Sequence, residues 1–391
     1  MSTVLHVGGA AVRDNRLVFD IDGGPAPQLW YEVDPPYAGW LRGDRYDPAV
    51  VALIPFAMKH GATIHVDGGI TGALLHGLRA GVVPILAQQL PTLRGTTIEA
   101  QFLDDCGCGT AVVTGLSGGV DSYSTIAVHL HHPAAAMRIS HLSFHDVGSH
   151  GPAEPARVFE ARLRRARESA RALGYPLVEV RSNLAQFQAT LYQQHHTLWN
   201  ASVAMALRNG VGTYLYSSTV PYRDVSVRPT KDIALADPIV LGLMSWSGVR
   251  CVSANAELTR LAKTELIADD PLVQATLDVC VKPLADARNC SVCWKCCRAE
   301  LTLDLLGKLD AFSQVFDLAA FRRVRAHYIA HLLAVDDPHG PDLVALARQR
   351  DRPIDTLGDR MRGLERKWLL RMGNHLPAAL AWRLDRWLTR F

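Results

Sequence analysis

The chain has 391 residues, of which 48% are hydrophobic and 20% are charged, and its formal net charge is +3. This length is enough for two or three domains, and the composition is typical of a protein with a substantial buried core, which excludes general disorder. The small net charge gives no indication of a nucleic acid or another polyanion as partner.

Targeting and membrane segments are not evident. Apolar stretches such as Val50 to Met58 are well short of a bilayer span. The N-terminus also lacks the basic region followed by an apolar core that marks a secretory signal. We therefore expect a cytoplasmic protein that does not act at a membrane.

Residues 1–105 predict a small α+β domain, because short strand-like runs are separated by Gly-Gly and Pro-rich turns. In chain order the expected elements are strands at Thr3–Val7, Arg16–Ile21 and Gln28–Val33, a helix at Ala49–His60, and strands at Ala62–Val66 and Thr97–Leu103.

Residues 106–300 show a different rhythm, in which apolar runs of strand length alternate with helical segments. The expected strands are Thr110–Thr114, Ile139–Phe144, Leu177–Val180, Thr213–Ser217 and Val249–Ser253, and the helices between them are Asp121–Leu130, Pro155–Leu173 and Leu198–Asn209. This alternation indicates an α/β fold with a parallel sheet covered on both faces. The six arginines of the second helix are expected to form a solvated basic face.

Residues 301–391 predict a helical domain from the spacing of their apolar positions. The expected helices are Leu301–Leu309, Leu318–Leu333, Pro341–Arg350, Leu357–Met372 and Pro377–Phe391. The last of these places an apolar stripe opposite three arginines. We expect it to dock on its own protein or on a second copy, which leaves a homodimer open, and not to anchor the chain in a membrane.

The strongest chemical signal lies in Thr110–Leu130, where a strand runs into a glycine-rich loop and then into a helix. Gly118 and Gly119 let the backbone approach a phosphate closely, and the following helix N-terminus favours an anion. Ser117 and Ser122 add hydroxyl donors, and Asp121 could orient magnesium or a water. The lysine of the commoner phosphate loop is missing, so the motif is not of the Walker type.

The string Ser-Gly-Gly-Val-Asp-Ser after a strand resembles the pyrophosphate loop of the N-type ATP pyrophosphatases, the adenine nucleotide alpha hydrolase superfamily. The resemblance implies a doubly wound parallel sheet, and cleavage of ATP between its α and β phosphates through an acyl- or imidoyl-adenylate. It also implies ATP and magnesium as ligands, with Ser117 and Asp121 as catalytic residues. The implied cofactor-binding residues of the loop are Gly115, Leu116, Ser117, Gly118, Gly119, Val120, Asp121 and Ser122.

A second segment, Leu261–Leu266, resembles the Lys-x-Glu sequence that these enzymes carry later in the nucleotide domain. The resemblance implies that Lys263 is catalytic and neutralises charge on the phosphates as the bond breaks. The alternative is a pair of solvated surface charges on a helix.

Five of the eight cysteines crowd one short segment, which in a large cytosolic protein favours a metal or redox site over a disulfide framework. Thiolates separated by two residues can reach one ion, and four of them suit structural zinc. A lone cysteine before Cys-x2-Cys-x2-Cys resembles the 7-cyano-7-deazaguanine synthase family, over roughly Gly109 to Cys297. We predict a zinc site whose ligands are Cys280, Cys290, Cys293 and Cys296. Cys297 is an alternative fourth ligand, and free thiols or an iron–sulfur cluster are alternative interpretations.

Polar residues also follow the later strands, where ligands gather in open α/β sheets. His145 and Ser217 are the two that we expect to contact nucleotide, and His195, His196 and Asn200 lie nearby. Cys106 and Cys108, just before the loop strand, are expected to be incidental.

Together these features predict an ATP-dependent ligase that adenylates a carboxylate or amide oxygen of a small-molecule or peptide acyl substrate. A nitrogen nucleophile then displaces AMP. No glutaminase is recognisable in the sequence, so the nitrogen donor would be free ammonia, a partner subunit or an amine. The alternatives are an ATP-dependent sulfur transferase with a persulfide cysteine, and a protein that binds nucleotide without turnover.

Overall fold

The computed structural model of the chain describes residues 4–105, 107–149, 156–284, 286, 288–335 and 337–373. The chain divides into two compact units. The first, here called the sheet unit, comprises Met1–Ser117, Thr125–Pro155 and Ala166–Glu257. The second, the helical unit, comprises Gly118–Ser124, Ala156–Arg165 and Leu258–Phe391.

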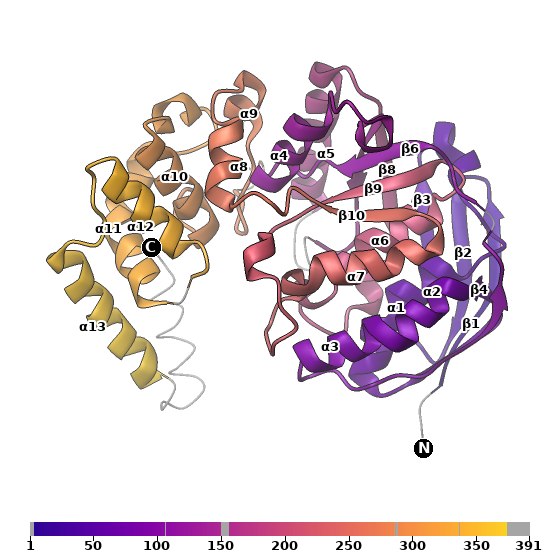
Figure 1. The fold of residues 1–391 in the computed structure, drawn as a ribbon. Coiled ribbons are helices and arrows are strands. Elements are labelled where there is room, and N and C mark those ends of the chain that lie inside the picture. The colour runs from indigo at the N-terminus through magenta and orange to yellow at the C-terminus, as the bar shows by residue number, and fades with distance from the viewer. Residues whose placement is uncertain are drawn as a thin grey trace. The chain divides into compact units, whose positions relative to one another are not determined.

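The sheet unit is built on ten strands of one mixed sheet (Figure 1). The strands are β1 (Val4–Arg13), β2 (Arg16–Asp22), β3 (Gln28–Val33), β4 (Thr63–Thr71), β5 (Ile98–Leu103), β6 (Ala111–Gly115), β7 (His141–His145), β8 (Leu177–Ser182), β9 (Val211–Ser217) and β10 (Arg250–Ala254). Their spatial order is β10-β9-β6-β7-β8-β3-β2-β1-β4-β5. The five strands from β10 to β8 pair in parallel, and so do β1, β4 and β5. Strands β3 and β2, which lie between these two groups, pair with their neighbours in antiparallel fashion. The α/β class with a mostly parallel sheet is therefore confirmed.

The N-terminal strands continue the sheet of the later strands. Val33 on β3 is the register partner of Val180 on β8, so no edge separates the two groups. The turn-rich pattern of residues 1–105 had instead predicted a separate small domain for these strands. The division into 1–105, 106–300 and 301–391 stays a prediction, and contacts group the chain into the two units above.

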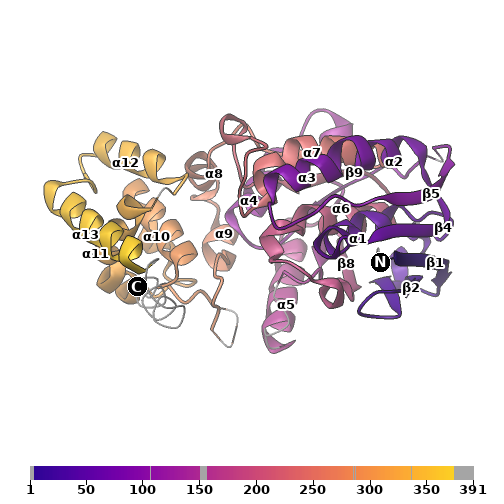
Figure 2. The same ribbon diagram turned by 90° about the horizontal axis from the view of Figure 1, so that it is seen from below.

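Helices of the sheet unit bury their apolar faces against the sheet and each other. They are α1 (Asp47–His60), α2 (Gly72–Gly77), α3 (Val83–Gln89), α6 (His196–Ala206) and α7 (Asp237–Met244). Helix α1 is buried over nearly its whole length and packs on α6 and β4. The indole N–H of Trp199 on α6 donates to the Ala52 carbonyl of α1 at 3.0 Å, which satisfies a polar atom inside this core. Figure 2 shows α1 and α6 next to the strands that they cover.

Two helices are shared between the units along the chain. They are α4 (Val120–His129) and α5 (Ala156–Leu173). The first five residues of α4 and the first ten of α5 belong to the helical unit, and the rest belongs to the sheet unit.

The helical unit also contains α8 (Arg260–Ile267), α9 (Pro271–Thr276), α10 (Trp294–Leu306), α11 (Leu318–Ala334), α12 (Gly340–Gln349) and α13 (Leu357–Gly373). Side-chain caps fix several starts, because Thr259, Asp270 and Asp317 accept backbone N–H groups of α8, α9 and α11. Helix α10 begins seven residues before the predicted Leu301 and ends at Leu306, where Gly307 caps it in the left-handed conformation. The predicted helix Pro377–Phe391 lies outside the described residues.

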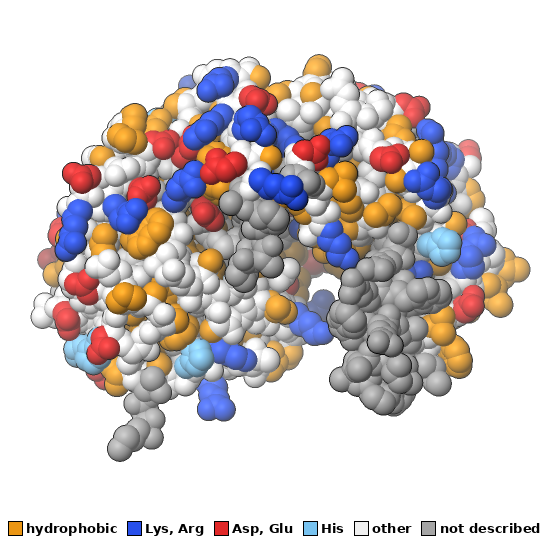
Figure 3. Space-filling view, turned by 180° about the vertical axis from the view of Figure 1, so that it is seen from behind, with side chains coloured by type: hydrophobic (Ala, Val, Ile, Leu, Met, Phe, Trp, Pro, Cys, Tyr) orange, Lys and Arg blue, Asp and Glu red, His pale blue; other side chains and the backbone are white. Residues whose placement is uncertain are grey.

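Within the described part of the chain, no helix is both long and apolar enough to cross a bilayer. On the face shown in Figure 3, Lys and Arg side chains are interspersed with Asp and Glu side chains. This mixture agrees with the small net charge.

Candidate nucleotide and metal sites

The glycine-rich loop connects β6 to α4, as predicted. Leu116 donates its N–H to the Ser143 carbonyl at 2.7 Å, which continues the pairing of β6 beyond its last residue. Gly118 has a φ of +77°, a conformation that other residues rarely adopt. Its carbonyl accepts the Asp278 N–H at 2.8 Å. The side chains of Leu116 and Val120 are buried, so these two predicted ligands could offer only backbone atoms.

Within the helical unit, Lys263 lies beside the first turn of α4. Its Nζ is 3.7 Å from Oδ1 of Asp121, and Arg260 approaches Oδ2 of the same carboxylate at 2.8 Å. The Lys263 residue is only 1% exposed. The alternative of a solvated surface charge is therefore wrong for Lys263, whereas Glu265 is exposed.

The same part of the helical unit carries an excess of positive charge. Arg298 on α10 forms an ion pair with Asp337 at 2.8 Å. Burial, together with the positive charges of Arg298 and Arg260, lowers the pKa of His339 to about 3. Arg260, Lys263 and Arg298 thus face two carboxylates, those of Asp121 and Asp337, and Lys295 adds a further positive charge that interacts with Arg260 and Asp121. A helix N-terminus next to such an excess favours a bound anion.

The basic face of α5 is only partly solvated. Arg162 and Arg165 both bind the Asp278 carboxylate, at 2.9 and 3.1 Å, and the Asp278 side chain is buried. Arg162 also donates to the Cys280 carbonyl at 2.9 Å. The prediction of a solvated face is therefore wrong for these two arginines, which fix the segment that contacts the Gly118 carbonyl.

The four predicted metal ligands converge in the helical unit. Sulfur atoms of Cys280, Cys290, Cys293 and Cys296 all lie within 4.8 Å of one another. Ser291 between them has a φ of +57°, which is uncommon for a non-glycine residue and marks a tight turn. Cys293 is the residue before α10, so Cys296 lies in the first turn of that helix.

The hydrogen bonds among the four thiols favour the thiolate form at Cys290 and Cys293, whereas they raise the pKa of Cys280 and Cys296. The backbone N–H groups of Lys282 and Cys290 point at the Cys280 sulfur at 3.2 and 3.4 Å. A hydrogen bond from Cys280 lowers the pKa of Cys290 to about 6, and a hydrogen bond from Cys280 also lowers the pKa of Cys293. The residues present therefore fit a metal such as zinc, which prefers four thiolates at tetrahedral geometry.

Cys297 does not belong to the cluster. Its buried sulfur points to the Ser291 carbonyl at 4.0 Å. The choice of Cys280 as fourth ligand therefore agrees with the structure, and Cys297 as the alternative does not. Cys108 is exposed, and Cys106 lies outside the described residues.

In the sheet unit, His145 and Ser217 occupy the last positions of β7 and β9. Both strands run parallel to β6, so these residues share its carboxyl edge. Nδ1 of the His145 ring donates a hydrogen bond to Oδ1 of Asn200 at 3.0 Å, and burial lowers the pKa of His145 to about 4. The Ser217 hydroxyl is buried and has no hydrogen-bond partner among the described residues. A buried, unsatisfied hydroxyl at this edge is a candidate ligand contact.

Two acids near this edge, Asp232 and Asp237, were not predicted from the sequence. His196 contacts Tyr216 Oη at 2.5 Å and Asp232 at 3.3 Å. The Asp237 carboxylate accepts the Thr197 hydroxyl at 2.6 Å, and burial raises its pKa. Asp237 directly precedes a proline at the start of α7, a pattern that signals a helix start but not a buried acid.

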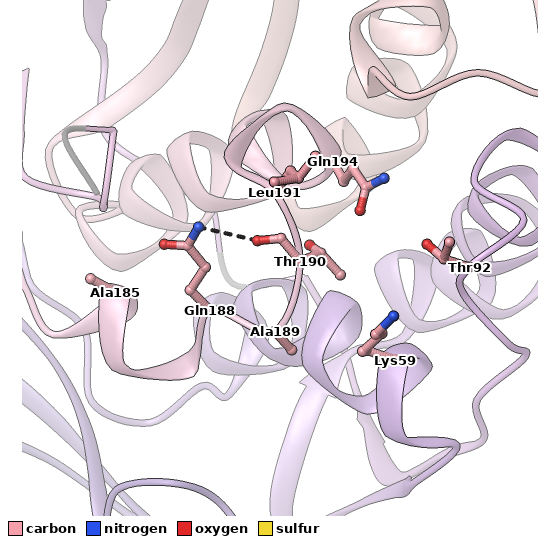
Figure 4. Close-up of a pocket in the computed structure, with 8 residues that line it drawn as sticks. All are labelled: Lys59, Thr92, Ala185, Gln188, Ala189, Thr190, Leu191 and Gln194. Carbon is pink, nitrogen blue, oxygen red and sulfur yellow. Dashed lines mark hydrogen bonds between the residues drawn. The ribbon is translucent and has the colours of Figure 1, made fainter. Parts of the chain in front are cut away.

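A separate depression of about 570 Å³ lies in the sheet unit between the end of α1 and the segment that connects β8 to α6. Figure 4 shows Lys59 on one side and Gln188, which donates to the Thr190 carbonyl, on the other. None of the predicted site residues belongs to its lining. The polar groups of the depression include side-chain amides and one ammonium group. The glycine-rich loop, on which the prediction of ATP chemistry depends, does not line it.

His195 should make the sheet unit acid-sensitive. The residue is fully buried, its Nδ1 contacts Thr190 Oγ1 at 2.9 Å, and Nε2 has no hydrogen-bond partner in the described part of the chain. Burial, assisted by the charge of His196, lowers its pKa to about 3. In the unfolded chain a histidine has a pKa of about 6.5, so the unfolded state binds more protons below that pH and stability falls.

We expect His195→Asn to remove roughly 3 kcal/mol of the stability loss between pH 7 and pH 4.5. Urea unfolding at the two pH values measures this difference. His131→Asn replaces an exposed histidine and is the control. Equal losses in the wild type and in His195→Asn would show that His195 does not cause the acid sensitivity.

Comparisons of the chain with protein-family models, with curated proteins and with solved structures gave no match. The resemblance to ATP pyrophosphatases therefore depends on the motif residues alone and stays a prediction.

Proposed function

We propose that this protein is an ATP-dependent ligase that adenylates a carboxylate or amide oxygen, releases pyrophosphate, and then couples a nitrogen nucleophile with release of AMP. One observation carries the proposal. A glycine-rich loop leads into α4, and two basic side chains of α8, Arg260 and Lys263, converge on the first turn of that helix.

The order of the strands supports a doubly wound nucleotide domain. From β6 the chain proceeds to β7 and β8 on one side, and then crosses to β9 and β10 on the other. In open α/β sheets, ligands bind at the carboxyl edge where the strand order reverses, which here is the edge of β6 and β9. Gly115 ends β6 and Ser217 ends β9, so the predicted residues of the sheet unit lie at this point.

The charges of the helical unit suit a polyphosphate. The backbone amides after Gly118 form the N-terminus of α4, which attracts anions. Lys263 and Arg260 would balance the charge that develops on pyrophosphate as it leaves, and such preorganised charges are a large source of catalysis. Asp121 holds both cationic side chains in place, and magnesium, when bound together with ATP, would add positive charge at this site.

Two buried thiols, those of Cys251 and Cys297, are poorly suited to sulfur transfer, whereas the thiol of Cys108 is exposed. A persulfide carrier needs an accessible thiol with a low pKa. Cys251 on β10 is buried, and burial raises its pKa to about 12. Burial also raises the pKa of Cys297. The acyl substrate, the nitrogen donor, the cytoplasmic location and a homodimer stay predictions.

Analysis of the nucleotide products tests the proposal. With ATP, magnesium, ammonium and a panel of carboxylic acids, we expect AMP and pyrophosphate, separated by anion-exchange chromatography. ADP as the sole nucleotide product would discard the adenylation mechanism. Binding of ATP to the purified protein is the second measurement, and its absence would contradict the proposal even without a known acyl substrate.

Ser117→Ala should slow pyrophosphate release by roughly 10- to 1000-fold, because it removes one hydroxyl donor next to the loop. Ser313→Ala removes an exposed hydroxyl of the helical unit and is the matched control. Equal rates of the two variants would remove Ser117 from the reaction.

A further inference from the structure

Two histidines and an aspartate lie together on the exposed face of the N-terminal strands. His6 on β1 and His65 on β4 are register partners of neighbouring parallel strands. Asp67 lies two residues beyond His65, so the pleat of β4 directs it to the same face. The residues that alternate with them along the two strands, such as Leu5, Ile64 and Val66, are buried on the opposite face, where α1 packs. Figure 2 shows β1, β4 and β5 side by side.

The distances in this cluster match a metal site. One ligand atom from each of His6, His65 and Asp67 lies within 4.8 Å of the others. Nε2 of His65 and Oδ1 of Asp67 are 3.8 Å apart. Ligand atoms at about 2.1 Å from one ion in tetrahedral geometry are separated by about 3.4 Å, so small rotations of these side chains would close the site.

A fourth residue fixes the orientation of His65. Glu99 on β5 is the register partner of His65 and contacts Nδ1 at 3.2 Å. A carboxylate at Nδ1 keeps the proton on that nitrogen, which leaves the lone pair of Nε2 for an ion on the side of Asp67. Histidines that ligate metals almost always have such a partner on the other nitrogen.

The neighbouring strand also leaves room for the carboxylate. Gly8 follows His6 by two positions, on the same face of β1. A Cβ atom at this position would lie 2.5 Å from Oδ2 of Asp67, which is closer than such atoms come. A side chain at Gly8 would therefore displace the Asp67 carboxylate.

We infer that His6, His65 and Asp67 bind a divalent transition-metal ion of the zinc type, with Glu99 as the residue that positions His65. Two imidazoles and one carboxylate suit zinc better than magnesium or calcium, which prefer oxygen ligands alone. The site is open to solvent, so water would complete the coordination. It shares no residue with the cysteine cluster or with the glycine-rich loop, and it is independent of the proposed function.

The full chain is first dialysed against a weak chelator, which leaves the tightly bound metal of the cysteine cluster in place. Calorimetric titration with Zn²⁺ at neutral pH then tests the inference. We expect the wild type to bind one additional equivalent. His65→Ala and Asp67→Ala should lose that equivalent, and Glu99→Gln should weaken it by about 10- to 100-fold. His60→Ala, which removes another exposed histidine of the sheet unit, should behave as the wild type.

Cobalt(II) separates this site from the cysteine cluster. A thiolate site gives an intense sulfur-to-cobalt absorption, whereas a site of two imidazoles and a carboxylate does not. The additional equivalent should bind without that absorption, and circular dichroism should show that His65→Ala remains folded. Unchanged zinc stoichiometry and affinity in folded His65→Ala, or no additional equivalent in the wild type, would overturn the inference.

Discussion

Replacing Cys293 by serine should release the bound metal and unfold most of the helical unit. The Cys293 sulfur is 3.9 Å from that of Cys280, and the residue is the last one before α10. Binding of structural zinc to thiolates contributes folding free energy on the order of 10 kcal/mol, which is comparable to the whole stability of a domain. The three thiols that remain, without a cation between them, also repel one another once they ionise, so the loss has no obvious compensation.

Elemental analysis and circular dichroism of the purified variant measure these effects. The wild type should contain one zinc ion at the cysteine cluster, and Cys293→Ser should contain none and lose solubility or helical signal. Cys297→Ala is the matched control, because that thiol is buried and adjacent but lies outside the cluster. Iron in the wild type, or a well-folded Cys293→Ser protein without metal, would contradict the assignment.

Helix geometry explains why Cys296, and not the adjacent Cys297, faces the other cluster sulfurs, which leaves Cys280 as the fourth ligand. Both residues lie in α10, where consecutive side chains point about 100° apart. Only one of them can therefore face the sulfurs of Cys290 and Cys293, which are fixed by the preceding turn. The spacing of two residues after Cys293 favours Cys296, as predicted, but the helix itself was expected to begin only at Leu301.

Local patterns predicted the strands well and their partners poorly. The strand Gln28–Val33 was predicted at the bounds that β3 has, because Gly- and Pro-rich turns delimit it in the sequence. Its antiparallel pairing with β8 joins residues about 150 positions apart, and no local periodicity encodes that choice. The short helices α2 and α3 were missed because six or seven residues show too few helical turns.

In the candidate site, too, local features were predicted from the sequence but contacts between distant segments were not. The loop sequence predicted that α4 follows directly, but the burial of Lys263 against Asp121 depends on how α8 packs on α4. Arg162 and Arg165 bind Asp278, which lies more than 110 positions later, so sequence periodicity could only suggest a solvated face. The position of a charged side chain depends on its ion-pair partners, which a pattern of apolar residues does not reveal.

Lys263→Met should reduce both ATP binding and pyrophosphate release, the latter by roughly 100- to 1000-fold, judging from the removal of single groups that stabilise developing charge. Methionine keeps a similar length and fills the buried space of the lysine stem, so the packing of α8 should persist. Lys308→Met, which removes an exposed lysine paired with Asp269 in the same unit, should leave both quantities unchanged.

The variant Asp121→Asn separates the role of Lys263 from the role of Asp121, its ion-pair partner. The substitution removes the carboxylate that balances Arg260 and Lys263, so the local positive charge rises. ATP should then bind at least as tightly as to the wild type, because the excess charge attracts phosphate. Pyrophosphate release should fall by at least as much as in Ser117→Ala if the carboxylate also positions magnesium, and an assay over a range of magnesium concentrations measures this dependence. Equal losses of ATP affinity in Asp121→Asn and Lys263→Met would show instead that the two residues act as one structural ion pair, and the catalytic role proposed for Lys263 would be lost.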